Sequence, residues 1–247
     1  MICEDKGMLR LAALLLSLAA LPAVAATAEE DLKQYLMIFE QSSKMADAAV
    51  DDLAWKGISD TRLFDRIEQQ MLADSRGLTM NDRVQRNHVA RQIKALGYSG
   101  QAKYEPTLTS LATDYRRPVE RALISLKLYA RWNPIISSRA TWDPKYSDDV
   151  NRVRNMLNSD DLQLQALGAK RVFFANSSEP MLMDMLAERL RACYKTVDDP
   201  DGVEAAGWMV NGLGRSQDAK HVALIREVAA GAASTKLRTR AEKNLRP

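Results

Sequence analysis

Residues 90–111 have the sequence ARQIKALGYSGQAKYEPTLTSL, in which two apolar stripes flank a Gly-Tyr-Ser-Gly turn. In each stripe the apolar residues are spaced i, i+4 and i+7: Val89, Ile93 and Leu96 before the turn, and Tyr104, Leu108 and Leu111 after it. This spacing is typical of a helix with one buried face. A glycine after a helix readily adopts the left-handed cap conformation, and a serine beside it can cap the next helix. The segment therefore predicts two helices joined by a short turn.

Similar turns recur along the chain, each between an apolar helix pattern and a second amphipathic one. Gly57, Gly97, Asn133, Asn176 and Gly214 mark them, with spacings of 40, 36, 43 and 38 residues. A period of about 39 residues is characteristic of helical-repeat proteins. The markers therefore predict about five helix pairs.

The whole chain shows the helical period, and no segment alternates with period two for long enough to predict a strand. We expect helices near 29–55, 61–74, 80–96, 101–113, 117–132, 148–158, 160–174, 179–195, 201–213, 217–230 and 235–245. Pro134 and Pro144 predict a loop insertion near residues 134–147, because proline interrupts a helix. The sequence thus predicts an all-α fold.

Two parts of the chain resemble HEAT-type repeats, including the short form found in phycobilisome-lyase-like proteins. One is residues 90–97 with 104–111, and the other is residues 207–214 with 222–229 and 236–245. The resemblance implies an α-solenoid of stacked antiparallel helix pairs over residues 29–247. It also implies a role in binding other macromolecules, and it carries no catalytic residue to this chain.

The first 28 residues have the three parts of an export signal. A basic start precedes an apolar run at residues 11–26, which ends in small residues that offer cleavage after Ala25 or as late as residue 28. The run has 16 residues, whereas a transmembrane helix needs about 20. We therefore predict a cleavable signal peptide at residues 1–25, followed by a soluble periplasmic protein without a membrane anchor. If translation begins at Met8 instead of Met1, Arg10 still precedes the apolar run, and the signal-peptide prediction is unchanged.

Residues of the catalytic and metal-binding types are few and scattered. His88 and His221 each lie beside a helix stripe, which favours packed or surface histidines over ligands. Asp198–Gly202 has the look of a calcium loop but lacks the end ligands, so an acidic helix N-terminus explains it better. Cys193 continues an apolar stripe and is expected to be a buried thiol, although pairing between chains is the alternative. We predict no catalytic, cofactor-binding or metal-binding residue.

The formal net charge is only +3, which argues against a nucleic-acid-binding protein. Basic residues nevertheless recur on several predicted helices: Arg83, Arg86, Arg91, Lys94, Arg116, Arg117, Arg121, Lys170, Arg171, Lys236, Arg238 and Arg240. Stacked repeats could align them into a positive ridge for an acidic protein, a lipid headgroup or an anionic envelope polymer. An ordinary solvated face is the favoured interpretation.

Aromatic and basic residues gather around the predicted loop. We take as the candidate interaction cluster Arg131, Trp132, Arg139, Trp142, Lys145 and Tyr146. Trp, Tyr and Arg contribute most of the binding energy at protein interfaces. The alternative is that the loop folds back and its aromatic rings seal the core between repeats.

These patterns together predict a non-catalytic periplasmic binding or scaffold protein that interacts with another protein through a helical-repeat surface. Two alternatives stay open. One is a maturation or cofactor-attachment helper enzyme with a pocket on its concave face. The other is a structural envelope protein that associates with copies of itself.

Overall fold

The computed structural model describes residues 28–246 except 42, 79–81 and 217. The regular secondary structure of these residues is entirely helical, which confirms the all-α class. The elements, in chain order, are α1 (Ala28–Gln41), α2 (Ser43–Lys56), α3 (Thr61–Asp74), α4 (Arg83–Gly97), a 3-10 turn (Ala102–Tyr104), α5 (Glu105–Ser110), α6 (Arg116–Ile136), α7 (Asp148–Asn158), α8 (Leu162–Phe174), α9 (Pro180–Cys193), α10 (Pro200–Arg215), α11 (Ala219–Gly231) and α12 (Thr235–Asn244). The predicted signal peptide at residues 1–25 lies outside the described residues.

Aspartates begin several of these helices by accepting a hydrogen bond from a backbone N–H of the first turn. Asp60, Asp161, Asp199 and Asp218 cap α3, α8, α10 and α11 in this way. The Asp199 carboxylate accepts from the backbone N–H of Gly202 at 2.8 Å. The acidic run before α10 is therefore a helix cap, as its sequence predicted.

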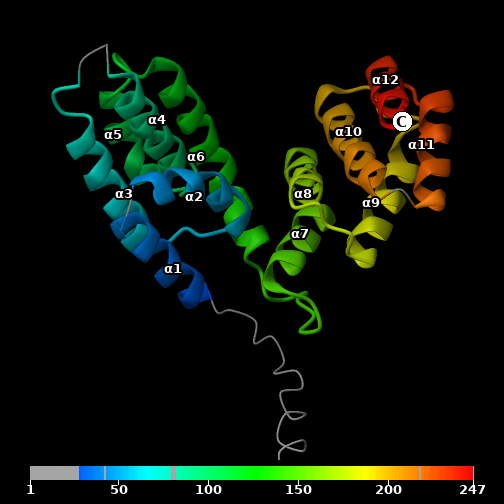
Figure 1. Ribbon diagram of the computed structural model, residues 1–247, viewed down its shortest axis with the longest axis horizontal. Coiled ribbons are helices and arrows are strands. Elements are labelled where there is room, and N and C mark those ends of the chain that lie inside the picture. The colour runs from blue at the N-terminus through cyan, green and yellow to red at the C-terminus, as the bar shows by residue number, and fades with distance from the viewer. Residues whose placement is uncertain (1–27, 42, 79–81, 217, 247) are drawn as a thin grey trace, which may run out of the picture.

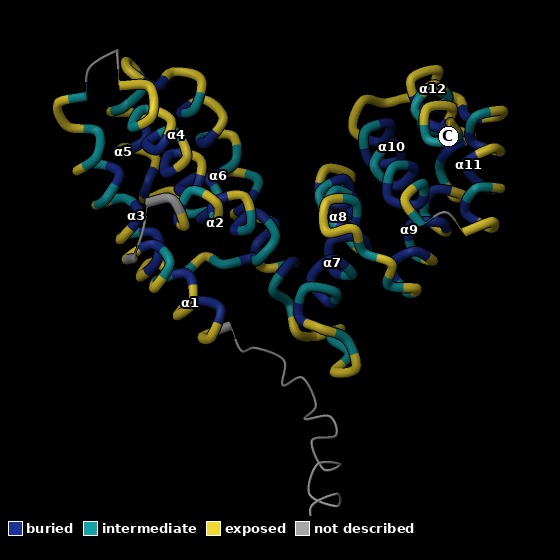
Figure 2. The backbone as a smooth tube through the Cα atoms, viewed as in Figure 1, coloured by how far each residue is buried: buried dark blue, intermediate teal, exposed yellow. Residues whose placement is uncertain are grey.

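The helices form a V whose two arms meet near α7 and α8 (Figure 1). One arm contains α1 to α6 around one hydrophobic core, and the other contains α7 to α12 around a second core. Burial follows this division, because the dark-blue inner faces of the helices lie inside each arm (Figure 2). A third, smaller core joins the arms where α2, α6, α7 and α8 meet, and consists of Ala54, Tyr129, Trp132, Ile136, Met156 and Leu164.

Within each arm, several helices pack against the helix two places further along the chain. In the first arm α2 packs on α4 and α4 packs on α6, while α1 packs on α3. In the second arm α8 packs on α10 and α10 on α12. At the junction, α2 also contacts α7 and α8. The α2–α4–α6 row is the part of this arrangement that positions the candidate site.

Ion pairs reinforce the junction of the arms. Asp149 of α7 accepts hydrogen bonds from Lys56 of α2 at 2.8 Å and from Arg171 of α8 at 3.0 Å. Arg152 of α7 bonds Asp31 of α1, and both of these side chains are buried. Removing one member of such a buried pair leaves an uncompensated charge, so these contacts favour one arrangement of the arms.

Three predicted segments have wrong boundaries. The helix predicted at 101–113 is a 3-10 turn followed by the six-residue α5, which ends at Ser110. The predicted helix 29–55 is two helices, α1 and α2, which pack against each other. The predicted loop near 134–147 begins only after Ile136, because α6 continues through Pro134. Pro134 is exposed in the last turn of α6, where it removes one backbone hydrogen bond from the helix.

The repeat markers are turn residues at only some positions. Gly57 and Asn176 have φ values of 67° and 50°, the left-handed conformation that their pattern predicted. Gly97 and Gly214 instead lie inside helices, and Gly100, with φ of 66°, takes the left-handed position after α4.

Asn133 is not a turn residue, because it is buried within α6. Its side-chain amide donates to the backbone carbonyls of Ile58, Tyr98 and Ser99 at 3.3, 3.0 and 3.1 Å. One side chain thereby holds the turn after α2 and the turn after α4 against α6. Asn133 therefore clamps two turns against α6, a role that its place in the series of repeat markers did not predict.

Candidate functional site

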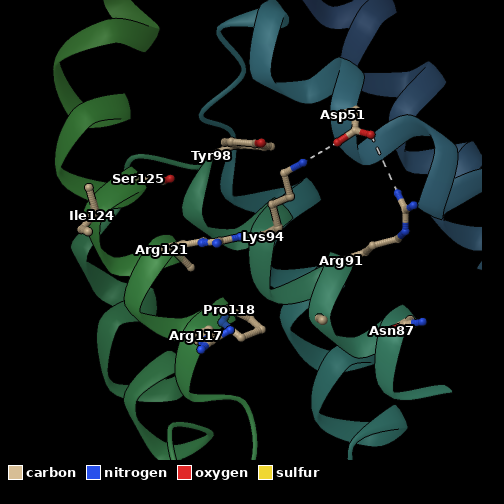
Figure 3. Close-up of a pocket in the computed structure, with 12 residues that line it drawn as sticks. Asp51, Asn87, Arg91, Lys94, Tyr98, Arg117, Pro118, Arg121, Ile124 and Ser125 are labelled. Atoms are coloured by element: carbon tan, nitrogen blue, oxygen red, sulfur yellow. Dashed lines mark hydrogen bonds and ion pairs between the residues drawn. The ribbon is translucent and has the colours of Figure 1, made fainter. Parts of the chain in front are cut away.

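A groove of about 930 Å3 lies between α4 and α6, with one residue contributed by α2 (Figure 3). We call it the basic groove and define it by its charged and larger side chains: Asp51, Arg91, Lys94, Tyr98, Arg117, Arg121 and Ile124. Four of these residues are basic and one is acidic, which gives a local charge of +3. The formal charge of the whole chain is also +3, so this groove concentrates positive charge that is balanced elsewhere.

The helical period explains why these side chains face the groove. On α6, Val119, Ala122 and Leu126 are buried in the core of the first arm. Arg117 and Arg121, one turn apart, are exposed on another face of the same helix. On α4, burial of the apolar stripe likewise leaves Arg91 and Lys94 exposed.

Asp51 of α2 holds the two basic residues of α4. Its carboxylate is 2.5 Å from Lys94 Nζ and 3.9 Å from an Arg91 nitrogen. Partial burial alone would lower the pKa of Lys94, but the hydrogen bond to Asp51 and the nearby Tyr98 raise it above its ordinary value. Lys94 is therefore a fixed positive charge at neutral pH.

Arg117 and Arg121 differ from the α4 residues because no carboxylate neutralises them within the described residues. Figure 3 shows Arg121 extending from α6 across the groove toward the side of Lys94. Ile124, one turn further along α6, has 61% of its surface exposed. The α6 wall thus offers two unpaired guanidinium groups followed by an apolar side chain.

His88 is packed on the buried side of α4. Its Nδ1 is 2.7 Å from an Asp47 oxygen and its Nε2 is 3.2 Å from an Asp74 oxygen. Gln92 donates to the same Asp74 carboxylate at 2.8 Å. These bonds tie α4 to α2 and to the end of α3, so His88 supports the groove wall and does not line it.

The second histidine and the cysteine lie in the other arm. His221 is buried, and its Nδ1 is 2.7 Å from the Ser216 hydroxyl. Burial lowers the pKa of His221, which favours the neutral ring. Cys193 is half-buried on α9, and burial raises the pKa of its thiol. No group of three or more potential metal ligands occurs within the described part of the chain.

The predicted interaction cluster is divided by the fold, beginning with its two α6 residues. Trp132 is buried, and its indole N–H donates to Asp161 at 2.8 Å. Its ring packs edge-on against Tyr129. Arg131 is exposed beside it, 3.5 Å from the same carboxylate. The expectation that Trp132 belongs to an accessible cluster is wrong, because Trp132 packs in the small core that joins the arms.

The other four residues of the cluster follow α6, in the loop at 137–147. The Arg139 guanidinium lies 3.5 Å from the centre of the Trp142 ring, which is half-buried. Lys145 lies 4.8 Å from the centre of the Tyr146 ring. These are two separate cation–π contacts, and a binding role for this loop stays a prediction.

The recurrent basic residues do not form one continuous ridge. Of those named from the sequence, the basic groove brings together Arg91, Lys94, Arg117 and Arg121. Arg171 is paired with two aspartates at the junction of the arms. The basic residues of α12 lie in the other arm. The spacing of Arg117 and Arg121 was the sequence signal for this site, but it did not reveal that α4 would face them.

Comparisons with models of protein families, with curated proteins and with solved structures found no match to this chain. The fold and the site therefore define it only as an all-helical, two-armed protein with a basic groove in its first arm.

Proposed function

We propose that this chain is a non-catalytic binding protein whose basic groove holds an acidic segment of another protein. The observation that carries the proposal is the pair Arg117 and Arg121, which face the groove without a carboxylate partner among the described residues. Two uncompensated guanidinium groups favour a ligand that supplies carboxylates, because Arg forms paired hydrogen bonds with them.

The shape and the apolar residues of the groove support a polypeptide as the ligand. The groove is an open channel along two helices and its lining mixes charge with exposed Ile124 and half-buried Tyr98. Protein interfaces combine such apolar and aromatic contacts with complementary charge. A nucleic acid would call for a larger and more extended basic surface.

The proposal includes the architecture and address inferred from the sequence. We interpret the helices as HEAT-type pairs stacked in a solenoid. The α2–α4–α6 and α8–α10–α12 rows, in which alternate helices pack on one another, support this interpretation. The basic and apolar parts of residues 1–25 support export to the periplasm. There the protein would act as a scaffold for an acidic partner.

The test is binding of a short fluorescein-labelled peptide with alternating glutamate and serine, measured by fluorescence anisotropy. The same peptide with lysine in place of glutamate is the ligand control. We expect the variant Arg117→Glu with Arg121→Glu to weaken glutamate-peptide binding by at least about 10-fold.

The matched control is Arg191→Glu with Arg226→Glu, which changes the net charge equally on exposed residues of the other arm. It should weaken binding much less. Binding should also weaken as NaCl rises from about 50 to 500 mM, because salt screens exposed charges. Equal losses for the two double variants would reject the groove as the binding site.

A further inference from the structure

A second groove continues from the basic groove on the inner side of the V. Its volume is about 910 Å3, and it shares Asp51, Lys94 and Tyr98 with the basic groove. Its walls come from α1 and α2 of the first arm and α8 of the second. We call it the apolar groove and define it by Tyr35, Met45, Trp55, Tyr129, Leu167 and Phe174.

Two large apolar side chains are exposed in this groove. Phe174, at the end of α8, has 63% of its surface exposed, and Met45 of α2 has 51% exposed. The Phe174 ring is held in place by Phe173 and Trp208, with ring centres 5.2 and 5.7 Å away. An immobilised aromatic ring loses little conformational freedom when a ligand covers it, and methionine adapts its shape to different partners. Both residues are suited to contact an apolar group.

The charges in the apolar groove are largely neutralised, unlike those in the basic groove. Arg171 bonds Asp52 at 2.9 Å and Asp149 at 3.0 Å. Lys170 lies 3.7 Å from Glu204. A ligand that crosses Tyr98 therefore passes from uncompensated positive charge to apolar surface with paired charges.

Resting on the function proposed above, we infer that the partner segment is amphipathic: its acidic part lies in the basic groove, and an adjoining aromatic or large aliphatic side chain anchors it in the apolar groove. The continuity of the two grooves through Tyr98 and the complementary charge of the first support this occupant. Tyr98 packs against Tyr129 with ring centres 4.8 Å apart, so a rigid aromatic step separates the two halves of the surface.

The test compares three fluorescein-labelled peptides by anisotropy on the full chain: the glutamate–serine peptide alone, and the same peptide with a Trp-Leu extension at either end. We expect one extended peptide to bind about 10-fold more tightly than the parent. Phe174→Ser and Met45→Ser should each reduce this gain without changing the affinity for the parent peptide.

Val84→Ser is the matched control, because Val84 is 82% exposed on α4 and lines neither groove. It should leave all three affinities unchanged. If the parent peptide binds but neither extension improves its affinity, the amphipathic inference is overturned and the proposed function stands. If no peptide binds, both are overturned. If light scattering shows a dimer that Phe174→Ser abolishes, a second copy of the chain occupies the apolar groove and the inference is wrong.

Discussion

The turn after α4 allows a stability prediction with an internal control, because two glycines share a backbone conformation but not an environment. Gly100 and Gly77 have φ values of 66° and 70°. A Cβ atom at Gly100 would lie 2.6 Å from the backbone nitrogen of Ala130 and from the backbone carbonyl carbon of Tyr129, whereas one at Gly77 would meet nothing within 4 Å. Alanine is therefore strained at both positions but obstructed only at Gly100.

The expected losses follow from these two effects. The left-handed conformation costs a residue with a Cβ about 1–2 kcal/mol, and the lower entropy of the unfolded chain returns about 0.4–1 kcal/mol. Gly77→Ala should thus reduce the free energy of unfolding by about 1 kcal/mol. Gly100→Ala adds a collision with the α6 backbone, and overpacking costs about 1–3 kcal/mol. Its total loss should be about 2–4 kcal/mol.

Urea unfolding followed by circular dichroism measures both variants, with the m-value checked for two-state behaviour. A loss of this size corresponds to roughly 2–4 °C in melting temperature for each kcal/mol in a chain of this length. Equal losses for Gly100→Ala and Gly77→Ala would refute the close approach of this turn to α6. That result would also remove the basis for Tyr98 as a fixed step between the two grooves.

Two further predictions concern the clamp in α6 and the junction of the arms. Asn133→Ala removes an amide that donates to three carbonyl oxygens, so it should reduce the free energy of unfolding in urea by about 2–3 kcal/mol. The control Asn87→Ala, at an exposed position, should reduce it by less than about 0.5 kcal/mol. Similar losses for the two variants would contradict the clamp. Burial alone would raise the pKa of Asp149, but its bonds to Lys56 and Arg171 lower it to about 2. The resulting stability is present above the ordinary carboxyl pKa and is lost as pH falls from about 4 to about 2. Because 42% of this side chain is exposed, we expect a contribution of about 1 kcal/mol after solvent screening. The natural chain should therefore be more stable than Asp149→Asn at pH 6, and this difference in the free energy of unfolding should shrink by about 1 kcal/mol at pH 2. A difference that does not change with pH would contradict the ion pairs.

Local sequence predicted the helices well where their ends carry a local signal. The start of α10 follows from Asp199 and Pro200, since the cap and the fixed proline φ act within one turn. The local pattern gave a wrong prediction at Pro134, because a proline inside a helix pattern usually indicates the start of a loop. Helix α6 continues through this residue and packs against α4 and α7, and such long-range contacts cannot be read from a local sequence pattern.

The basic groove was not the site predicted from the sequence, which was the cluster around the loop near 134–147. The sequence indicated only that basic residues, among them Arg91, Lys94, Arg117 and Arg121, recur on the predicted helices, and a solvated face was the favoured interpretation for them. Their meeting depends on how α4 packs against α6. Trp132 shows the opposite error, because its bond to Asp161 across the junction buries a residue that looked suited to a surface.

The sequence by itself determined the all-helical class, most helix boundaries, the helix caps and the residue types available for binding. These depend on interactions within about one or two helical turns. Only the tertiary structure decided which faces meet, that Asn133 clamps two turns, and that a basic and an apolar groove join at Tyr98. The reason is that these features depend on the rotation and crossing of helices far apart in the chain, which packing of the whole core determines.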